Sequence, residues 1–156
     1  MRRKDKEITD KKIIEEILSE SKICRIAMTD NNGMPYIVPL NYGYSDNTIF
    51  FHSAPTGKKV ELLKQNKRVC FEVEFGVEIT ESVTSCKWST KYRSLIGYGT
   101  IEIITGANLK KNGLDIIMTH NGKSTNNFYE EKHLENLVIL KLHIDEISCK
   151  QSGNWS

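Results

Sequence analysis

The sequence of 156 residues has little net charge and no long apolar run. Its formal net charge is only +2, and the one basic cluster, within residues 2–12, is typical of a solvated tail rather than a nucleic-acid surface. No apolar segment reaches the roughly 18 residues of a membrane span, and the N-terminal charges are not followed by the apolar region of a signal peptide. We therefore expect a cytoplasmic protein with no nucleic-acid or membrane partner.

Proline and glycine are also scarce, at 3 and 10 residues, which excludes a low-complexity chain. Hydrophobic residues make up 38%, enough for a chain of this length to bury a core without disulfides or a metal. The four cysteines contain no C-x-x-C pair and are expected to be reduced thiols, of which Cys86 lies in a polar stretch beside Lys87. The spacing of the four histidines indicates no metal site.

Hydrophobic periodicity predicts a mainly β domain with short flanking helices. Helical spacing occurs at residues 10–20, where Asp10 is a candidate N-cap, at 55–66 and at 109–120, with a further helical turn near Glu130. Alternation of apolar and polar residues predicts six strands, at residues 24–28, 36–44, 48–52, 69–75, 91–105 and 138–145, with a polar loop at 76–89. Hairpin connections favour an antiparallel barrel that hides most of its edges. We expect one domain, residues 1–150, followed by a tail, residues 151–156.

The segment from Phe51 to Lys59 is typical of an anion site. A strand ends there, a turn of small residues follows, and Lys58 and Lys59 stand where a helix begins. Free N–H groups and the helix dipole favour an anion at that end, whereas two lysines oppose the dipole when no anion is bound. The pattern therefore favours phosphate binding, and the alternative is a pair of lysines on a solvated helix face.

A second basic group lies at the start of the long strand at residues 91–105, in Lys91-Tyr92-Arg93-Ser94. A guanidinium with an adjacent hydroxyl suits phosphate oxygens. The alternative is an edge-strand arginine that the strand keeps out of the core.

Four segments, in order along the chain, resemble the nitroimidazole-resistance group of the pyridoxamine 5′-phosphate oxidase-like flavoproteins, and the opening residues 1–18 are similar to that group as well. The four segments are Val38-Pro39-Leu40-Asn41-Tyr42-Gly43-Tyr44, Phe51-His52-Ser53-Ala54-Pro55-x-Gly57-Lys58-Lys59, Val69-Cys70-Phe71-Glu72-Val73 and Trp88-Ser89-x-Lys91-Tyr92-Arg93-Ser94-Leu95-Ile96-Gly97-Tyr98-Gly99.

The resemblance implies an FMN-binding split β-barrel that forms a homodimer, with a flavin in each of two clefts between the subunits. Carried over to this chain, the expected cofactor-binding residues are Val38, Pro39, Leu40, Asn41, His52, Ser53, Ala54, Gly57, Lys58, Lys59, Tyr92, Arg93 and Ser94. Lys58 and Lys59 would contact the phosphate, and residues 38–41 would line the flavin ring. The C-terminal residues lack the basic and aromatic segment of the vitamin B6 oxidases, which argues against that substrate.

His52 is the expected catalytic residue, because the resemblance implies a histidine beside the flavin and the substrate. An imidazole can donate a proton near neutral pH as reduced FMN delivers electrons. The resulting prediction is an FMN-dependent oxidoreductase that reduces a small acceptor, such as a nitroimidazole or another nitroaromatic, with electrons from NAD(P)H or another donor. Two alternatives remain open: a haem-binding split barrel with His52 as ligand, and a flavin-binding or redox-sensing dimer without turnover.

Overall fold

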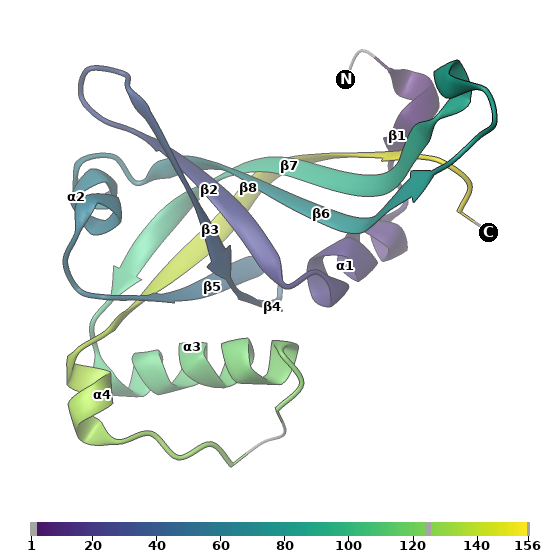
Figure 1. Ribbon diagram of the computed structural model, residues 1–156. Helices are drawn as coiled ribbons and strands as arrows, with labels where there is room; N and C mark the ends of the chain where they lie inside the picture. Colours follow the sequence, from purple (N-terminus) through teal and green to yellow (C-terminus); the bar gives the residue numbers. More distant parts are fainter. Residues whose placement is uncertain (1–2, 124–125, 156) are drawn as a thin grey trace.

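One antiparallel sheet forms the body of the protein in a computed structural model that describes residues 3–123 and 126–155 (Figure 1). Its strands follow the order β3-β2-β6-β7-β8-β5-β4, and β1 pairs with β8. In chain order the elements are the 3-10 turn η1 (Lys4–Lys6), β1 (Glu7–Ile8), α1 (Lys11–Glu20), β2 (Ile23–Thr29), β3 (Pro35–Asn41), β4 (Gly43–Ser45), β5 (Thr48–Ser53), α2 (Lys58–Gln65), β6 (Arg68–Thr80), the 3-10 turn η2 (Ser85–Lys87), β7 (Ser89–Ile104), α3 (Ala107–His120), α4 (Glu131–Glu135) and β8 (Val138–Ser152).

The mainly β class with short flanking helices is confirmed, and the sheet is open between β3 and β4, as in a split barrel. The described residues form eight strands rather than the predicted six. The predicted strand at 36–44 divides at Tyr42, whose buried hydroxyl donates to the carbonyl oxygen of Leu18 at 2.7 Å. β1 was missed because two residues are too short to show an alternating pattern.

Two long strands extend beyond their predicted limits. β6 continues to Thr80 and β7 begins at Ser89, so the predicted loop at 76–89 is shortened to residues 81–88. β8 continues to Ser152, so the first two residues of the predicted tail belong to the sheet. No helix in the described part of the chain is long and apolar enough to cross a membrane.

The concave face of the sheet encloses the main core. Alternate residues of every long strand point inward, among them Ile26, Phe51, Phe71, Leu95 and Leu142, each fully buried. α1 closes one end of this core with Ile17 and Leu18. Its predicted N-cap is confirmed, since the Asp10 carboxylate accepts from the backbone N–H of Lys12 at 2.8 Å.

α3 packs across the outside of the sheet and builds a smaller core with α4 (Figure 1). Ile104, Leu114, Leu134 and Ile139 form this cluster. Gly113, which lowers the helix propensity of this segment, faces Ile139. A Cβ at Gly113 would lie 2.9 Å from Cγ2 of Ile139, so the glycine allows the helix to approach the sheet closely.

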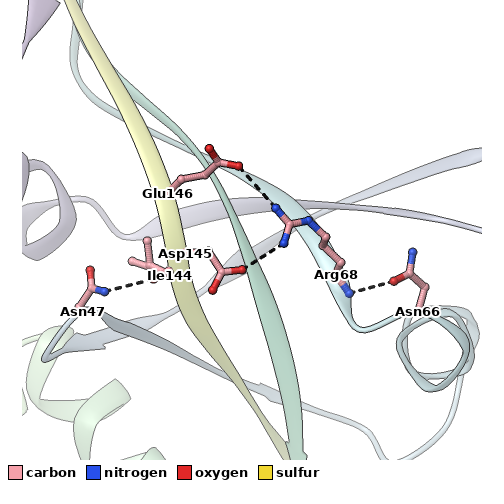
Figure 2. Close-up of polar contacts among 6 residues, drawn as sticks. All are labelled: Asn47, Asn66, Arg68, Ile144, Asp145 and Glu146. Atoms are coloured by element: carbon pink, nitrogen blue, oxygen red, sulfur yellow. Dashed lines mark hydrogen bonds and ion pairs between the residues drawn. The ribbon is translucent and has the colours of Figure 1, made fainter.

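The end of α2 is tied to a bulge in β8 (Figure 2). Arg68, at the start of β6, reaches Asp145 at 3.3 Å and Glu146 at 3.5 Å, and its backbone N–H donates to the Asn66 side chain at 3.0 Å. The register of β7 and β8 shifts there, where Tyr98 pairs with Glu146 but Gly99 pairs with Ile144. These ion pairs are exposed, so each contributes about 0–1 kcal/mol and mainly fixes orientation.

Candidate functional site

α2 begins directly after Gly57, and no side chain caps its first turn. The first intrahelical bond runs from the N–H of Glu61 to the carbonyl of Gly57 at 3.0 Å, so the N–H groups of residues 58–60 have no partner within the helix. Lys58 is exposed and Lys59 is half-buried on this same turn. The start of α2 therefore combines free N–H groups and a positive dipole end with two lysines on its first turn, the features on which the predicted anion site depends.

The two lysines occupy different environments. Nζ of Lys58 lies 4.6 Å from the centre of the Tyr36 ring on β3, which holds it by a cation–π contact. Burial lowers the pKa of Lys59, because its surroundings disfavour the charged form. An anion bound at the start of α2 would supply the opposite charge that this half-buried ammonium lacks.

His52, Ser53 and Ala54 connect the end of β5 to this turn, and their side chains diverge. His52 is exposed on the outer face of β5 and pairs with Ile139 of β8. Ser53 is buried on the inner face and donates to the carbonyl of Ala54 at 3.0 Å. The side chain of His52 therefore lies on the outer face of the sheet, whereas that of Ser53 lies on the inner face.

Residues 38–41 belong to β3, at one end of the strand order. Val38 and Leu40 pack against the main core, whereas Pro39 and Asn41 are exposed. β3 pairs with β2 along its whole length, so its other edge presents backbone groups to the surroundings. These are the backbone groups through which residues 38–41 were predicted to line a flavin ring.

Tyr92, Arg93 and Ser94 are consecutive on β7 but do not form one cluster. Arg93 is buried on the inner face, where its guanidinium contacts Glu16 at 2.7 Å and Gln151 at 3.3 Å. Tyr92 and Ser94 lie on the outer face and line a cavity of about 420 Å³. The other residues lining this cavity are Glu72, Glu74, Val77, Thr90, Ile96 and Lys150.

Lys150 is a candidate binding residue that the sequence analysis missed. It pairs with Ser94 across β7 and β8, and its Nζ lies 5.5 Å from the Tyr92 ring centre. Burial raises the pKa of Glu72 in the same cavity, although Arg25 at 3.0 Å opposes this shift. The alternation of residues 138–144 breaks at Asp145 and Glu146, where the register of β7 and β8 shifts, so the sequence pattern did not place Lys150 beside Ser94.

One copy of the chain does not bring the two basic groups together. β6 begins at Arg68, shortly after the end of α2, and Arg93 pairs with Phe75 of the same strand. At ~3.3 Å per residue, Arg68 and Phe75 are about 23 Å apart along β6. Figure 1 shows α2 at one end of the long strands and β1 at the other. Ser94, next to Arg93, therefore lies well along the long strands from the point where β6 leaves α2.

Comparisons with known proteins identify the family. Residues 10–151 match the family described as pyridoxamine 5′-phosphate oxidase. A crystal structure from Bacteroides thetaiotaomicron, of a protein proposed to act in 5-nitroimidazole antibiotic resistance, is 32% identical with a TM-score of 0.82. The alignment covers 93% of this chain and 86% of that chain.

Two more distant structures share the fold. A FAD- and heme-binding protein from Mycobacterium smegmatis is 22% identical with a TM-score of 0.83, covering 96% of this chain and 75% of that chain. A flavocytochrome from Azotobacter vinelandii is 18% identical with a TM-score of 0.83, covering 99% of this chain and 72% of that chain. None of the curated proteins matches the sequence. The family match over residues 10–151, together with the identity to the Bacteroides structure, shows that this chain belongs to the pyridoxamine 5′-phosphate oxidase-like split-barrel family.

Proposed function

We propose that this protein is an FMN-dependent oxidoreductase that acts as a homodimer and reduces a small acceptor such as a nitroaromatic compound. The observation that carries the proposal is the start of α2, where Lys58 and Lys59 lie on an uncapped first turn and Lys58 contacts Tyr36 of the end strand β3. A helix start with two lysines suits a phosphate, and an open strand edge suits a planar ring. FMN combines these two chemical features.

The residues at the start of α2 fit the charge of this cofactor. The half-buried ammonium of Lys59 would regain a counter-charge from a phosphate group, and Lys58 is already oriented by Tyr36. When bound, FMN supplies the capacity to accept electrons from a donor and pass them to an acceptor. The protein's own contribution is to hold the phosphate, orient the ring along β3 and leave room for the acceptor.

A second copy completes the site in this proposal. Tyr92, Ser94 and Lys150 lie together on the outer face, well along the long strands from α2, and in this proposal they contact the flavin held by the other subunit. The same outer face exposes Ile37, Ile96 and Tyr98, of which Ile37 and Tyr98 lie in one row across β3, β2, β6 and β7. Exposed apolar side chains in one row favour pairing of two such faces.

His52 is the proton donor in this proposal. It is exposed at the end of β5, two residues before the turn that leads to Lys58. Its imidazole can deliver a proton to an acceptor that receives electrons. The Bacteroides relative, named for 5-nitroimidazole resistance, supports a nitro compound as the acceptor to test first.

The first experiment is the absorption spectrum of the untreated purified protein, followed by titration with FMN. Flavin absorption bands would support the proposal. A haem Soret band would contradict it and show that the protein binds haem. Turnover of NADH or NADPH with a nitroimidazole then separates an enzyme from a flavin-binding dimer without activity.

The second experiment replaces Lys58 and Lys59 together with alanine. We expect FMN affinity to fall by about tenfold or more, because two charge-assisted contacts to phosphate are lost. Lys64 and Lys67, which are exposed at the other end of α2, provide a charge-matched double alanine control. Equal FMN affinity of both double variants would contradict the phosphate assignment.

A further inference from the structure

The indole ring of Trp155 packs against the base of the β6–β7 hairpin. It stacks on Phe75 of β6, with ring centres 6.1 Å apart and an interplanar angle of 26°. Cζ of Arg93 lies 4.1 Å and Nζ of Lys91 lies 4.5 Å from the indole centre, and both residues are on β7. The indole N–H donates to the carbonyl of Ser152 at 2.9 Å. One side chain near the end of the sequence thus contacts both strands of the hairpin.

The contact falls where the pairing of β6 and β7 is interrupted. Phe75 pairs with Arg93, but the next pair is Glu78 with Lys91, so Gly76 and Val77 form an irregularity without direct partners. Trp155 lies over this point. A Cβ at Gly76 would come 2.5 Å from Cη2 of the indole, so glycine leaves the space that the ring fills. Packing by Trp155 therefore replaces support that regular strand pairing would have provided.

Arg93 transmits this contact to the rest of the protein. Its side chain is enclosed by the Glu16 carboxylate at 2.7 Å, by Gln151 at 3.3 Å and by the indole of Trp155. It joins α1, β8 and the C-terminal residues to a single position on β7. A guanidinium held on three sides leaves the backbone at residue 93 little freedom.

We propose that Trp155 is a positioning residue for the flavin site, acting through Arg93 and Lys91. These two side chains alternate along β7 with Tyr92 and Ser94, which point to the outer face and line the cavity there. Fixing the inner side chains fixes the backbone from which the outer pair projects. This inference rests on the proposed function, in which Tyr92 and Ser94 contact the flavin held by the other subunit.

The test compares Trp155→Ala, Trp155→Leu and Trp155→Phe with the unmodified protein in FMN titrations. We expect the alanine and leucine variants to bind FMN about tenfold more weakly and to shift the absorption spectrum of the bound flavin, because they lack an aromatic face for the two cations. The phenylalanine variant keeps that face and should stay within about threefold of the unmodified protein. Trp88→Ala serves as the matched control, since Trp88 is half exposed and donates only to a neighbouring loop carbonyl.

The outcomes separate the positioning role from the proposed function. If the unmodified protein binds no FMN, the proposed function fails and the inference fails with it. If the unmodified protein binds FMN and a folded Trp155→Ala variant binds it equally well with the same spectrum, only the positioning role is wrong. If the alanine variant does not fold, Trp155→Leu decides, because it keeps apolar volume without the ring: affinity equal to that of Trp155→Phe would overturn the role.

Discussion

Lys58 on α2 lies over the ring of Tyr36 on β3, with its Nζ 4.6 Å from the ring centre. This contact joins the helix start that suits a phosphate to the strand edge that suits a flavin ring. The two features come from separate parts of the sequence, and each alone has an ordinary structural explanation. Their contact supports treating them as parts of one binding site.

Replacing His52 tests its role as proton donor. We expect His52→Gln to retain FMN but to reduce a nitro acceptor about 10²-fold more slowly, because the amide cannot deliver a proton. The measurement is the reoxidation rate of reduced flavin per bound FMN. Loss of flavin with an unchanged rate per bound FMN would make His52 a binding residue instead.

FMN affinity should fall at alkaline pH earlier than for an ordinary lysine site. Burial lowers the pKa of Lys59 below the usual 10.5, and only the protonated ammonium attracts the phosphate. As pH rises through this lowered pKa, the charge and the attraction are lost together. Titration of FMN binding against pH, with Lys59→Arg as the always-charged comparison, measures the effect. A fall of equal size and position in the arginine variant would assign the pH dependence to another group.

Stability should decline in mild acid because of His120. Its Nε2 lies 2.7 Å from the carbonyl oxygen of Ser21, its ring packs 4.6 Å from the Tyr42 ring, and burial lowers its pKa below 6.5. The hydrogen bond with Ser21 opposes this lowering of the pKa, Lys22 adds to it, and Glu20 opposes it. The folded state therefore binds fewer protons than the unfolded state, so the free energy of unfolding decreases as pH falls through about 6.5 and below.

Urea unfolding at several pH values checks this expectation. His120→Gln keeps a donor for Ser21 and should show a flatter dependence between neutral and mildly acidic pH. His133→Gln is the control, because the His133 side chain is 75% exposed. If His120→Gln and the unmodified protein lose stability in parallel, another group is responsible.

Gly113→Ala should destabilise the protein although alanine favours helices. The gain in helix propensity is about 1 kcal/mol, but the added methyl group would meet the fully buried Ile139 at 2.9 Å, and overpacking costs about 1–3 kcal/mol. Thr119→Ala, at an exposed position of the same helix, should be neutral or slightly stabilising. Denaturant unfolding of the three proteins shows whether close packing or propensity dominates at residue 113.

The sequence was sufficient for features that depend on local patterns. Alternation identified the strands other than β1 and the separate β4, helical spacing with Asp10 identified α1, and the two lysines after Gly57 identified the start of α2. Features that depend on distant partners were not predictable in this way. The break at Tyr42 coincides with a hydrogen bond to Leu18, and β6 continues past Phe75 because residues 78–80 pair with β7 beyond a bulge.

The candidate site shows the same division. The turn at residues 54–57 and the helix start at Lys58 could be predicted from local sequence, and the anion site proposed there rests on that geometry. Arg93 was grouped with Ser94 because the two are adjacent in the sequence, yet a strand places adjacent side chains on opposite faces. Lys150 lines the outer-face cavity with Tyr92 and Ser94 because β8 pairs with β7. The sequence pattern did not specify that pairing.

The prolines of β3 restrict how two copies of this protein can meet. Pro35 and Pro39 both lie on this end strand, where Pro39 pairs with Arg25 of β2. A proline has no N–H to donate to an incoming strand. On an edge strand, the side of the proline that lacks this donor faces outward. Continuous strand-to-strand polymerisation along the β3 edge is thereby disfavoured.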